Sequence, residues 1–202
     1  YFYQLNDKIE FDTIFADLLK RRFLDLRKTD AAGLRDFCAG TEAIFCKPAG
    51  LCGGEGIQRV VTVDIGDYDA LYDSLVKNGQ LLIEEPIRQH PDMNQLCPDS
   101  VNTVRIVTLV TDNGAQMVYA LVRMGMGGVC VDNVSSGGMY APVNEHGQLY
   151  RPAFCDKTGK YYERHPLTGT DIVGFQIPLF DQALDLCRMA SQRVEEHLKY
   201  IG

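Results

Sequence analysis

The feature that most constrains this chain is a glycine-rich segment that directly follows a predicted strand. The segment reads FCKPAGLCGGEGI over residues 45–57, so that Lys47 stands where the strand ends and four glycines follow within eight residues. Glycine lets backbone N–H groups converge on one point, and the lysine adds a positive charge, which together suit a polyphosphate. No G-K-[ST] follows, and the strand–turn–helix context is missing, which argues against a P-loop and a Rossmann loop. The open alternative is a hairpin whose glycines only satisfy turn geometry.

Length and composition indicate a globular protein. The 202 residues suffice for one large domain or two small lobes, and 46% hydrophobic with 23% charged residues is typical of globular chains. The longest apolar runs, such as Val118 to Val122, are far shorter than the roughly 20 residues of a membrane-spanning helix. The net charge is −7 and the basic residues are dispersed, which argues against nucleic acid as a partner. Seven scattered cysteines and no secretory segment indicate a reducing cytoplasm.

The pattern of apolar residues predicts an α+β chain with two halves of different character. In the first half we predict helices over Glu10 to Phe23, 31–38 and 69–77, and strands over 43–46, 60–63 and 81–85. In the second half we predict strands over 101–111, 116–124, 146–151 and 159–163 and a helix over 179–199. Asp112-Asn113-Gly114 is a hairpin signal. A boundary near Pro86 to Pro91 gives two lobes, residues 1–87 and 88–202.

Two arginines on neighbouring predicted strands indicate a site for anionic oxygens. Arg105 shares a strand face with Val107 and Leu109, which predicts that its guanidinium points where a core side chain would. Arg123 lies late on the next strand, and VDNVSSGG follows at 131–138. Arginine offers a bidentate fork to phosphate or carboxylate. The open alternative is a structural ion pair between Arg105 and a glutamate across the sheet.

Taken in order, these motifs resemble the signature of ATP-grasp enzymes. The signature comprises Lys8 in NDK, Lys47 before the glycine-rich segment, the 83–87 hinge, Arg105, Arg123 and N-x-x-x-G-G at 133–138. The sugar-transfer-associated ATP-grasp group looks closer still. That likeness rests on QH at 89–90, SVNTVRIVT at 100–108, VDNVSSGG at 131–138 and HPLTGTDIVGFQIP at 165–178.

The resemblance implies an ATP-grasp-like fold of two α+β lobes with the nucleotide between them. It implies that ATP and Mg²⁺ are the cofactors and that a carboxylate is converted into an acyl phosphate, which an amine or another nucleophile then attacks. Lys8 and Lys47 would contact the phosphates, and Glu84, Glu85 and Ile87 would hold adenine. The loop that would close over the β- and γ-phosphates contains Gly50, Gly53, Gly54, Glu55 and Gly56. Arg105, Arg123 and Asn133 would be the catalytic residues.

One departure from the family pattern concerns the metal ligands. The family places an E-x-N pattern near the end of the domain, whereas Glu195 and Glu196 are adjacent and are expected to form a solvated helix face. We therefore expect the fold to be truncated, with the metal ligands beyond Gly202, and the activity of this fragment by itself is left open. The expected substrate is a carboxylate-bearing small molecule or a sugar-linked compound in polysaccharide biosynthesis.

Two other functions remain open. A non-catalytic nucleotide-binding module would lack the metal-binding strands, and a kinase acting on a hydroxyl would use Asp132 as its base. His165 is expected to cap a turn or to serve as a base, and His90 to touch ribose. His146 and His197 are expected at the surface.

Overall fold

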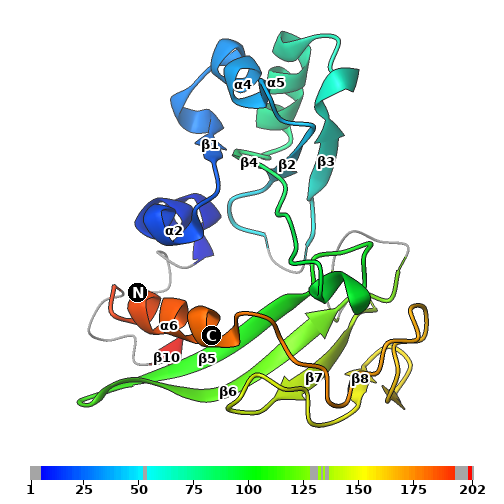
Figure 1. Cartoon of the computed structure of the whole chain (residues 1–202). Coiled ribbons are helices and arrows are strands. Elements are labelled where there is room, and N and C mark those ends of the chain that lie inside the picture. Colours follow the sequence, from blue (N-terminus) through cyan, green and yellow to red (C-terminus); the bar gives the residue numbers. More distant parts are fainter. Residues whose placement is uncertain are drawn as a thin grey trace. The chain divides into compact units, whose positions relative to one another are not determined.

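The computed structural model describes residues 6–51, 54–127, 132, 134, 137–193 and 200–201 of the chain. The chain divides into two compact units, Tyr1–Ile87 and Arg88–Gly202, which we treat separately (Figure 1). Each unit combines helices with an antiparallel sheet, so the predicted α+β class is confirmed. None of the helices formed by the described residues has the length and apolarity that a membrane crossing demands.

The described residues of the first unit build a four-stranded antiparallel sheet. Its spatial order is β1 (Phe23–Asp25), β4 (Leu82–Glu84), β2 (Ala43–Lys47) and β3 (Gln58–Val61). The strands expected over 43–46, 60–63 and 81–85 are present, with shifted ends, whereas β1 was not predicted. Because β2 and β4 are antiparallel neighbours in which Phe45 lies opposite Glu84, Lys47 and Glu84 are diagonal neighbours on the same face of the sheet.

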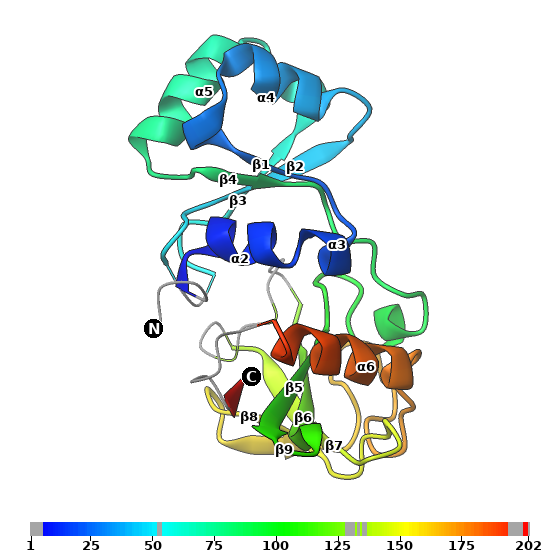
Figure 2. The same cartoon turned by 90° about the vertical axis from the view of Figure 1, so that its left-hand side faces the viewer.

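Two helices of this unit, α4 (Ala31–Cys38) and α5 (Tyr68–Lys77), lie on one side of its sheet (Figure 2). Asp30 caps α4 by accepting from the Gly33 N–H, and Asp67 caps α5 by accepting from Asp69 and Ala70. The buried core consists of Leu26, Leu34, Phe37, Cys38, Ile44, Cys46, Leu75 and Ile83. Short 3₁₀ turns, η1 (Leu26–Lys28) and η2 (Thr62–Asp64), follow β1 and β3.

The single helix predicted over Glu10 to Phe23 is wrong. The structure has α2 (Lys8–Ile14) and the one-turn α3 (Ala16–Leu19), and Lys20 ends the helical stretch in the left-handed conformation at φ 52°. The chain then enters β1, where the Glu85 N–H donates to the Arg22 carbonyl at 3.2 Å and the Arg22 N–H donates to the Glu85 carboxylate at 2.9 Å. Pairing with β4 thus overrides the helical periodicity that continues to Phe23.

The described residues of the second unit build a six-stranded antiparallel sheet. Its spatial order is β10 (Tyr200–Ile201), β5 (Thr103–Thr111), β6 (Gly114–Met124), β7 (Met139–Val143), β8 (Ala153–Cys155) and β9 (Lys160–Tyr162). The hairpin at Asp112-Asn113-Gly114 is confirmed, since Thr111 pairs with Gly114 across it. Residues 146–151 do not form the predicted strand and make only isolated bridges, while β7 was not predicted.

Helix α6 (Phe180–Ser191) packs on β5 and β6 of this sheet. The predicted helix over 179–199 is confirmed as far as Ser191; Glu195, Glu196 and His197 lie outside the described residues. A 3₁₀ turn, η3 (Met93–Gln95), precedes β5. The core beneath α6 consists of Met93, Leu96, Ile106, Ala120, Val122, Met124, Met139, Ala141, Val143, Leu149, Ala153, Cys155, Ile172, Ile177, Phe180 and Leu184.

The two faces of the β5–β6 pair carry different side chains. The core face contains Ile106 and Val122, while Thr103, Arg105 and Arg123 share the opposite face, as the cross-strand pair Thr103–Arg123 requires. Arg105 does lie on the same face as Val107, as expected, but this is the face away from the core. The expectation of a core-facing arginine is therefore wrong, because α6 packs against the other face.

Candidate functional site

Lys47 and Glu84 form an ion pair on one face of the first unit's sheet. Lys47 is the last residue of β2, and its Nζ pairs with Oε2 of Glu84, the last residue of the neighbouring β4. The Glu84 side chain is only 3% exposed, and its other oxygen, Oε1, accepts from the Arg21 guanidinium. A buried carboxylate between two cations is stabilised by both of them, and it fixes the position of the Lys47 ammonium.

A second carboxyl group, that of Asp12 on α2, joins this cluster. Asp12 Oδ1 lies 3.6 Å from the Arg21 guanidinium. Burial raises the pKa of Asp12 to about 7, and a hydrogen bond and charge repulsion from Glu84 act in the same direction. Asp12 Oδ2 and Arg21 Nε are buried and have no hydrogen-bond partner among the described residues. The cluster of Asp12, Arg21, Lys47 and Glu84, here named the buried charge cluster, therefore contains two buried polar atoms without a hydrogen bond from the described residues.

The sequence analysis missed Asp12 and Arg21. The helix predicted over Glu10 to Phe23 does not extend to Arg21, so the approach of Arg21 to Glu84 could not be anticipated. Asp12 did leave a signal: it stands one helical turn after Ile9, and both residues are buried on α2. An acidic residue at a buried helical position needs a charged or hydrogen-bonding partner, which points to the cluster.

Lys8, the first residue of α2, lies against the segment that follows Lys47. Its backbone N–H donates to the Ala49 carbonyl at 2.9 Å, and its Nζ contacts the carbonyls of Pro48, at 3.3 Å, and Leu51. The structure therefore brings Lys8 to the start of the glycine-rich segment.

Among the glycines of this segment, Gly54 and Gly56 adopt positive φ angles of 83° and 71°. A Cβ added to Gly56 would lie 2.7 Å from Pro48 Cγ, whereas one added to Gly50 would meet no atom within 4 Å. The Gly56 carbonyl accepts from the Gln80 side chain at 2.8 Å. Glu55 is exposed, and Gly53 lies outside the described residues. Glycine is thus required at Gly56 by backbone geometry and packing.

The three residues predicted to hold adenine have different environments. The Glu84 side chain belongs to the buried charge cluster. Glu85 binds Arg22, whose backbone N–H lowers the pKa of that carboxyl, with the Arg22 side chain 3.2 Å away adding to the effect. Ile87 is 50% exposed, and no hydrogen bond to its backbone N–H is made by the part of the chain that the structure describes. Of the three, Ile87 offers a backbone group to a ligand.

In the second unit, Arg123 is fixed by a polar contact set that includes Thr103 and Asp132. Its Nε and one terminal nitrogen donate to Thr103 Oγ1 at 3.0 and 2.8 Å, and it lies 3.6 Å from Asp132. Thr103 donates its backbone N–H to Asp132 Oδ2 at 3.1 Å and its hydroxyl to the same atom. Sequence reasoning missed Thr103. Asp132 is buried and engaged by these contacts, so its geometry does not favour the hydroxyl-kinase reading.

Arg105 is exposed, and it makes no ion pair with any residue that the structure describes. The alternative reading, a structural ion pair with a glutamate across the sheet, is therefore not seen there. Arg105 shares its face with Arg123, because Arg105 pairs with Leu121 and Thr103 with Arg123. Asn133 lies outside the described residues.

The three described histidines have ordinary environments. His165 is buried; its Nε2 lies 2.8 Å from the Gly125 carbonyl, its Nδ1 accepts from the Leu167 and Thr168 N–H groups, and burial lowers its pKa. His165 therefore caps a turn. His90 likewise accepts the Asp92 N–H at 3.2 Å, and His146 is exposed, as predicted.

Nothing among the described residues forms a group of three or more His, Cys, Asp or Glu side chains suited to a metal ion.

The family model described as "Sugar-transfer associated ATP-grasp" matches residues 59–202. Among solved structures, the chain is similar to the D-alanine-D-alanine ligase from Coxiella burnetii, with 13% identity and a TM-score of 0.40. That match covers 93% of this chain and 58% of the ligase chain, so the chain spans less than two thirds of the length of that structure. No curated protein matches significantly.

Proposed function

Because the chain belongs to the sugar-transfer associated ATP-grasp family, we propose that it binds ATP and activates a carboxylate by phosphorylating it. The product of this step is an acyl phosphate, which an amine or another nucleophile then attacks. The observation that carries the proposal is the placement of Lys8, Lys47 and the glycine-rich segment at one end of the first unit's sheet.

The donors at this place fit a polyphosphate. Two ammonium groups and a segment with glycines at positive φ provide cationic and N–H donors, which phosphate oxygens accept. The Lys47 ammonium pairs with Glu84, and the Lys8 ammonium donates to backbone carbonyls. We propose that phosphate oxygens join these contacts and that the free Ile87 N–H binds the adenine edge.

The arginine face of the second unit provides the charge stabilisation for phosphoryl transfer. We propose that Arg105, which is exposed and has no acidic partner in the described residues, contacts the transferred phosphoryl group. Arg123 is held in place by Thr103 and Asp132 and would bind the same anionic centre, and Asn133 would assist. Such catalysis consists mainly of positioning and charge stabilisation.

The proposed reaction consists of two successive displacement steps. A carboxylate oxygen of the substrate attacks the γ-phosphorus of ATP, and the bond to the β–γ bridging oxygen breaks to release ADP. An amine then attacks the acyl carbon, and inorganic phosphate leaves. Mg²⁺, when bound, neutralises charge on the phosphates.

The family description is the support for placing the substrate in sugar or polysaccharide chemistry. We propose a cytoplasmic reaction, where ATP is available and thiols stay reduced; the described cysteines, Cys38, Cys46, Cys97, Cys155 and Cys187, are free thiols.

The experiment that tests the proposal measures ADP release with Mg²⁺-ATP, a panel of carboxylates and hydroxylamine as the nucleophile. Carboxylate-dependent ADP release together with hydroxamate formation is expected, because hydroxylamine traps an acyl phosphate. ADP release with alcohols and without hydroxamate would establish a kinase instead. Tight ATP binding without ADP release under any condition would favour a non-catalytic nucleotide-binding module.

A further inference from the structure

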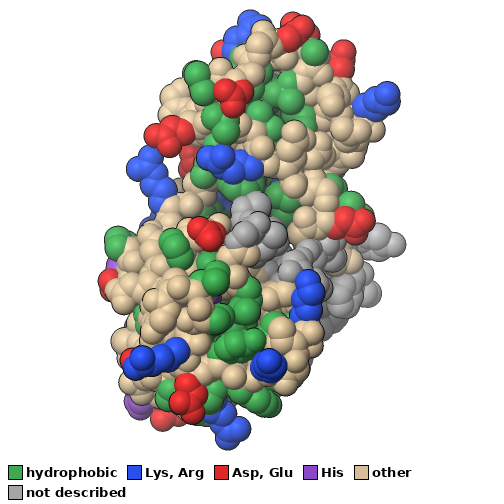
Figure 3. All heavy atoms as spheres, turned by 90° about the vertical axis from the view of Figure 1, so that its right-hand side faces the viewer, with side chains coloured by type: hydrophobic (Ala, Val, Ile, Leu, Met, Phe, Trp, Pro, Cys, Tyr) green, Lys and Arg blue, Asp and Glu red, His purple; other side chains and the backbone are tan. Residues whose placement is uncertain are grey.

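An aromatic depression lies on the second unit's sheet. Tyr140, Phe154 and Tyr161 stand side by side on β7, β8 and β9, because Tyr140 pairs with Phe154 and Phe154 with Tyr161. Their ring centroids are 6.0 Å and 4.8 Å apart. Together with Pro142, Arg151 and Pro152 they line a depression of about 470 Å³. Figure 3 shows hydrophobic side chains at the surface of this unit with Lys and Arg side chains beside them.

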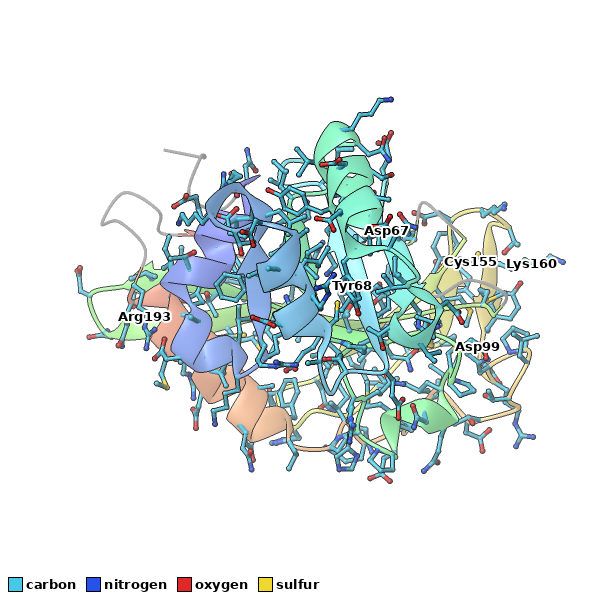
Figure 4. All side chains as sticks on the ribbon, turned by 90° about the horizontal axis from the view of Figure 1, so that it is seen from above. Asp67, Tyr68, Asp99, Cys155, Lys160 and Arg193 are labelled. Atoms are coloured by element: carbon cyan, nitrogen blue, oxygen red, sulfur yellow. The ribbon has the colours of Figure 1, made fainter. Side chains whose placement is uncertain are left out.

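These aromatic rings are not needed to fill the core. The opposite face of the same strands carries the small buried residues Ala141, Ala153 and Cys155, which pack into the core beneath α6. Tyr161, by contrast, is 72% exposed. The hairpin is closed by the pair Cys155–Lys160, which Figure 4 shows together at one side of the unit. A row of rings across three strands, half-buried at Tyr140 and Phe154 and exposed at Tyr161, is typical of a surface that binds a ligand.

The charge at the depression is positive. Arg151 is exposed, its guanidinium lies 5.6 Å from the centre of the Tyr150 ring, and it pairs with no carboxylate within the described ranges. Arg123 belongs to the same sheet face, since it pairs with Tyr140 across β6 and β7. An anionic group on the ligand would therefore find a planar guanidinium fork, which suits carboxylate and phosphate oxygens.

We propose that this depression binds a pyranose ring that carries an anionic group, either a carboxylate or a phosphate. The C–H face of the ring packs on Tyr161 and Phe154, its hydroxyls hydrogen-bond with tyrosine hydroxyls, and its anionic group pairs with Arg151. This inference rests on the proposed function only in treating the sugar as a substrate.

The test uses saturation-transfer NMR on the whole chain with glucuronate, glucose 1-phosphate, glucose and acetate as separate probes. Glucuronate, glucose 1-phosphate or both should receive saturation at the ring C–H protons, and both should bind more tightly than glucose, which lacks the charge, and than acetate, which lacks the ring. The two anionic probes distinguish carboxylate from phosphate. Tyr161→Ala should lower the affinity for the tighter-binding anionic sugar by about threefold or more. Arg151→Gln should lower the affinity for this anionic sugar to the affinity measured for glucose.

Two control variants carry matched changes away from the depression. Tyr119→Ala removes another exposed tyrosine of the same sheet, and Arg188→Gln removes an exposed arginine of α6. Neither should alter sugar binding. Absence of saturation for both anionic sugars, or equal binding by Tyr161→Ala and the wild type, would overturn the inference. ATP affinity, measured on the same samples, reports separately on the proposed function. Sugar binding without ATP binding would contradict only the proposed function. ATP binding without sugar binding would contradict only this inference.

Discussion

The ammonium group of Lys47 is paired with the buried carboxylate of Glu84 on the adjacent strand. The lysine is thereby held at the start of the glycine-rich segment, and the same carboxylate also binds Arg21. Removing the carboxylate would leave two cations, with side chains about 20% exposed, short of a counter-charge. This relationship connects the stability of the first unit to its proposed ligand.

Glu84→Gln should lower the free energy of unfolding by about 3 kcal/mol, because breaking a buried ion pair leaves a charge without compensation. The neighbouring variant Glu85→Gln is the control. Glu85 and Arg22 have side chains that are 28% and 53% exposed, so its loss should cost within about 1 kcal/mol. Urea unfolding of the two variants measures the difference. Equal unfolding midpoints would show that Glu84 does not hold the cluster together.

Asp12 should make stability depend on pH. Because its pKa is raised from 3.8 to about 7, the folded state retains a proton that the unfolded state has already released. The free energy of unfolding should therefore fall as the pH rises from about 4 to about 7, and Asp12→Asn should remove this part of the fall. Unfolding at a series of pH values measures it, with the exposed Asp36→Asn as control. Parallel curves for the wild type and Asp12→Asn would contradict the assignment.

Gly56→Ala should be far more harmful than Gly50→Ala. The added methyl group at Gly56 meets Pro48 at 2.7 Å in a backbone of positive φ, whereas the one at Gly50 meets nothing within 4 Å. We expect Gly56→Ala to lower stability by about 1–3 kcal/mol and to weaken ATP binding, since the segment must shift. Thermal unfolding and calorimetry report the two effects. An ATP affinity equally affected by both variants would mean that the conformation at Gly56 is irrelevant to binding.

Arg105 and Arg123 should separate stability from catalysis. Arg105 is exposed, so Arg105→Ala should leave stability within about 0.5 kcal/mol of the wild type and lower ADP release by about 10²-fold. Arg123→Ala should also lower stability, by about 2 kcal/mol, because the buried Asp132 and Thr103 lose their partner. Unchanged ADP release by Arg105→Ala would remove it from the catalytic residues.

The sequence predicts best where local signals agree with the tertiary contacts. The β5–β6 hairpin was predicted because Asp112-Asn113-Gly114 separates two β-branched runs, and the pairing of Thr111 with Gly114 bears this out. The helix predicted over 69–77 agrees with α5 nearly to both ends, and the structure adds the cap at Asp67.

Prediction from the sequence fails where pairing between distant residues decides the structure. The apolar spacing through Phe23 favours a longer helix, and only the pairing of residues 23–25 with the distant residues 82–84 places them in a strand. The buried charge cluster depends on the same pairing, so Arg21 could not be assigned to it. The alternation along β5 correctly placed Arg105 with Val107, but it could not reveal which face α6 would cover.

The central claim is that Lys47 and the glycine-rich segment bind the polyphosphate of ATP. Titration calorimetry with Mg²⁺-ATP tests it most directly, with Lys47→Ala compared with Lys77→Ala, which removes an exposed lysine in the last turn of α5. A charged hydrogen bond contributes roughly 1.5–3 kcal/mol, so Lys47→Ala should weaken binding by at least about tenfold, while Lys77→Ala should match the wild type. An ATP affinity that Lys47→Ala leaves unchanged would contradict the account.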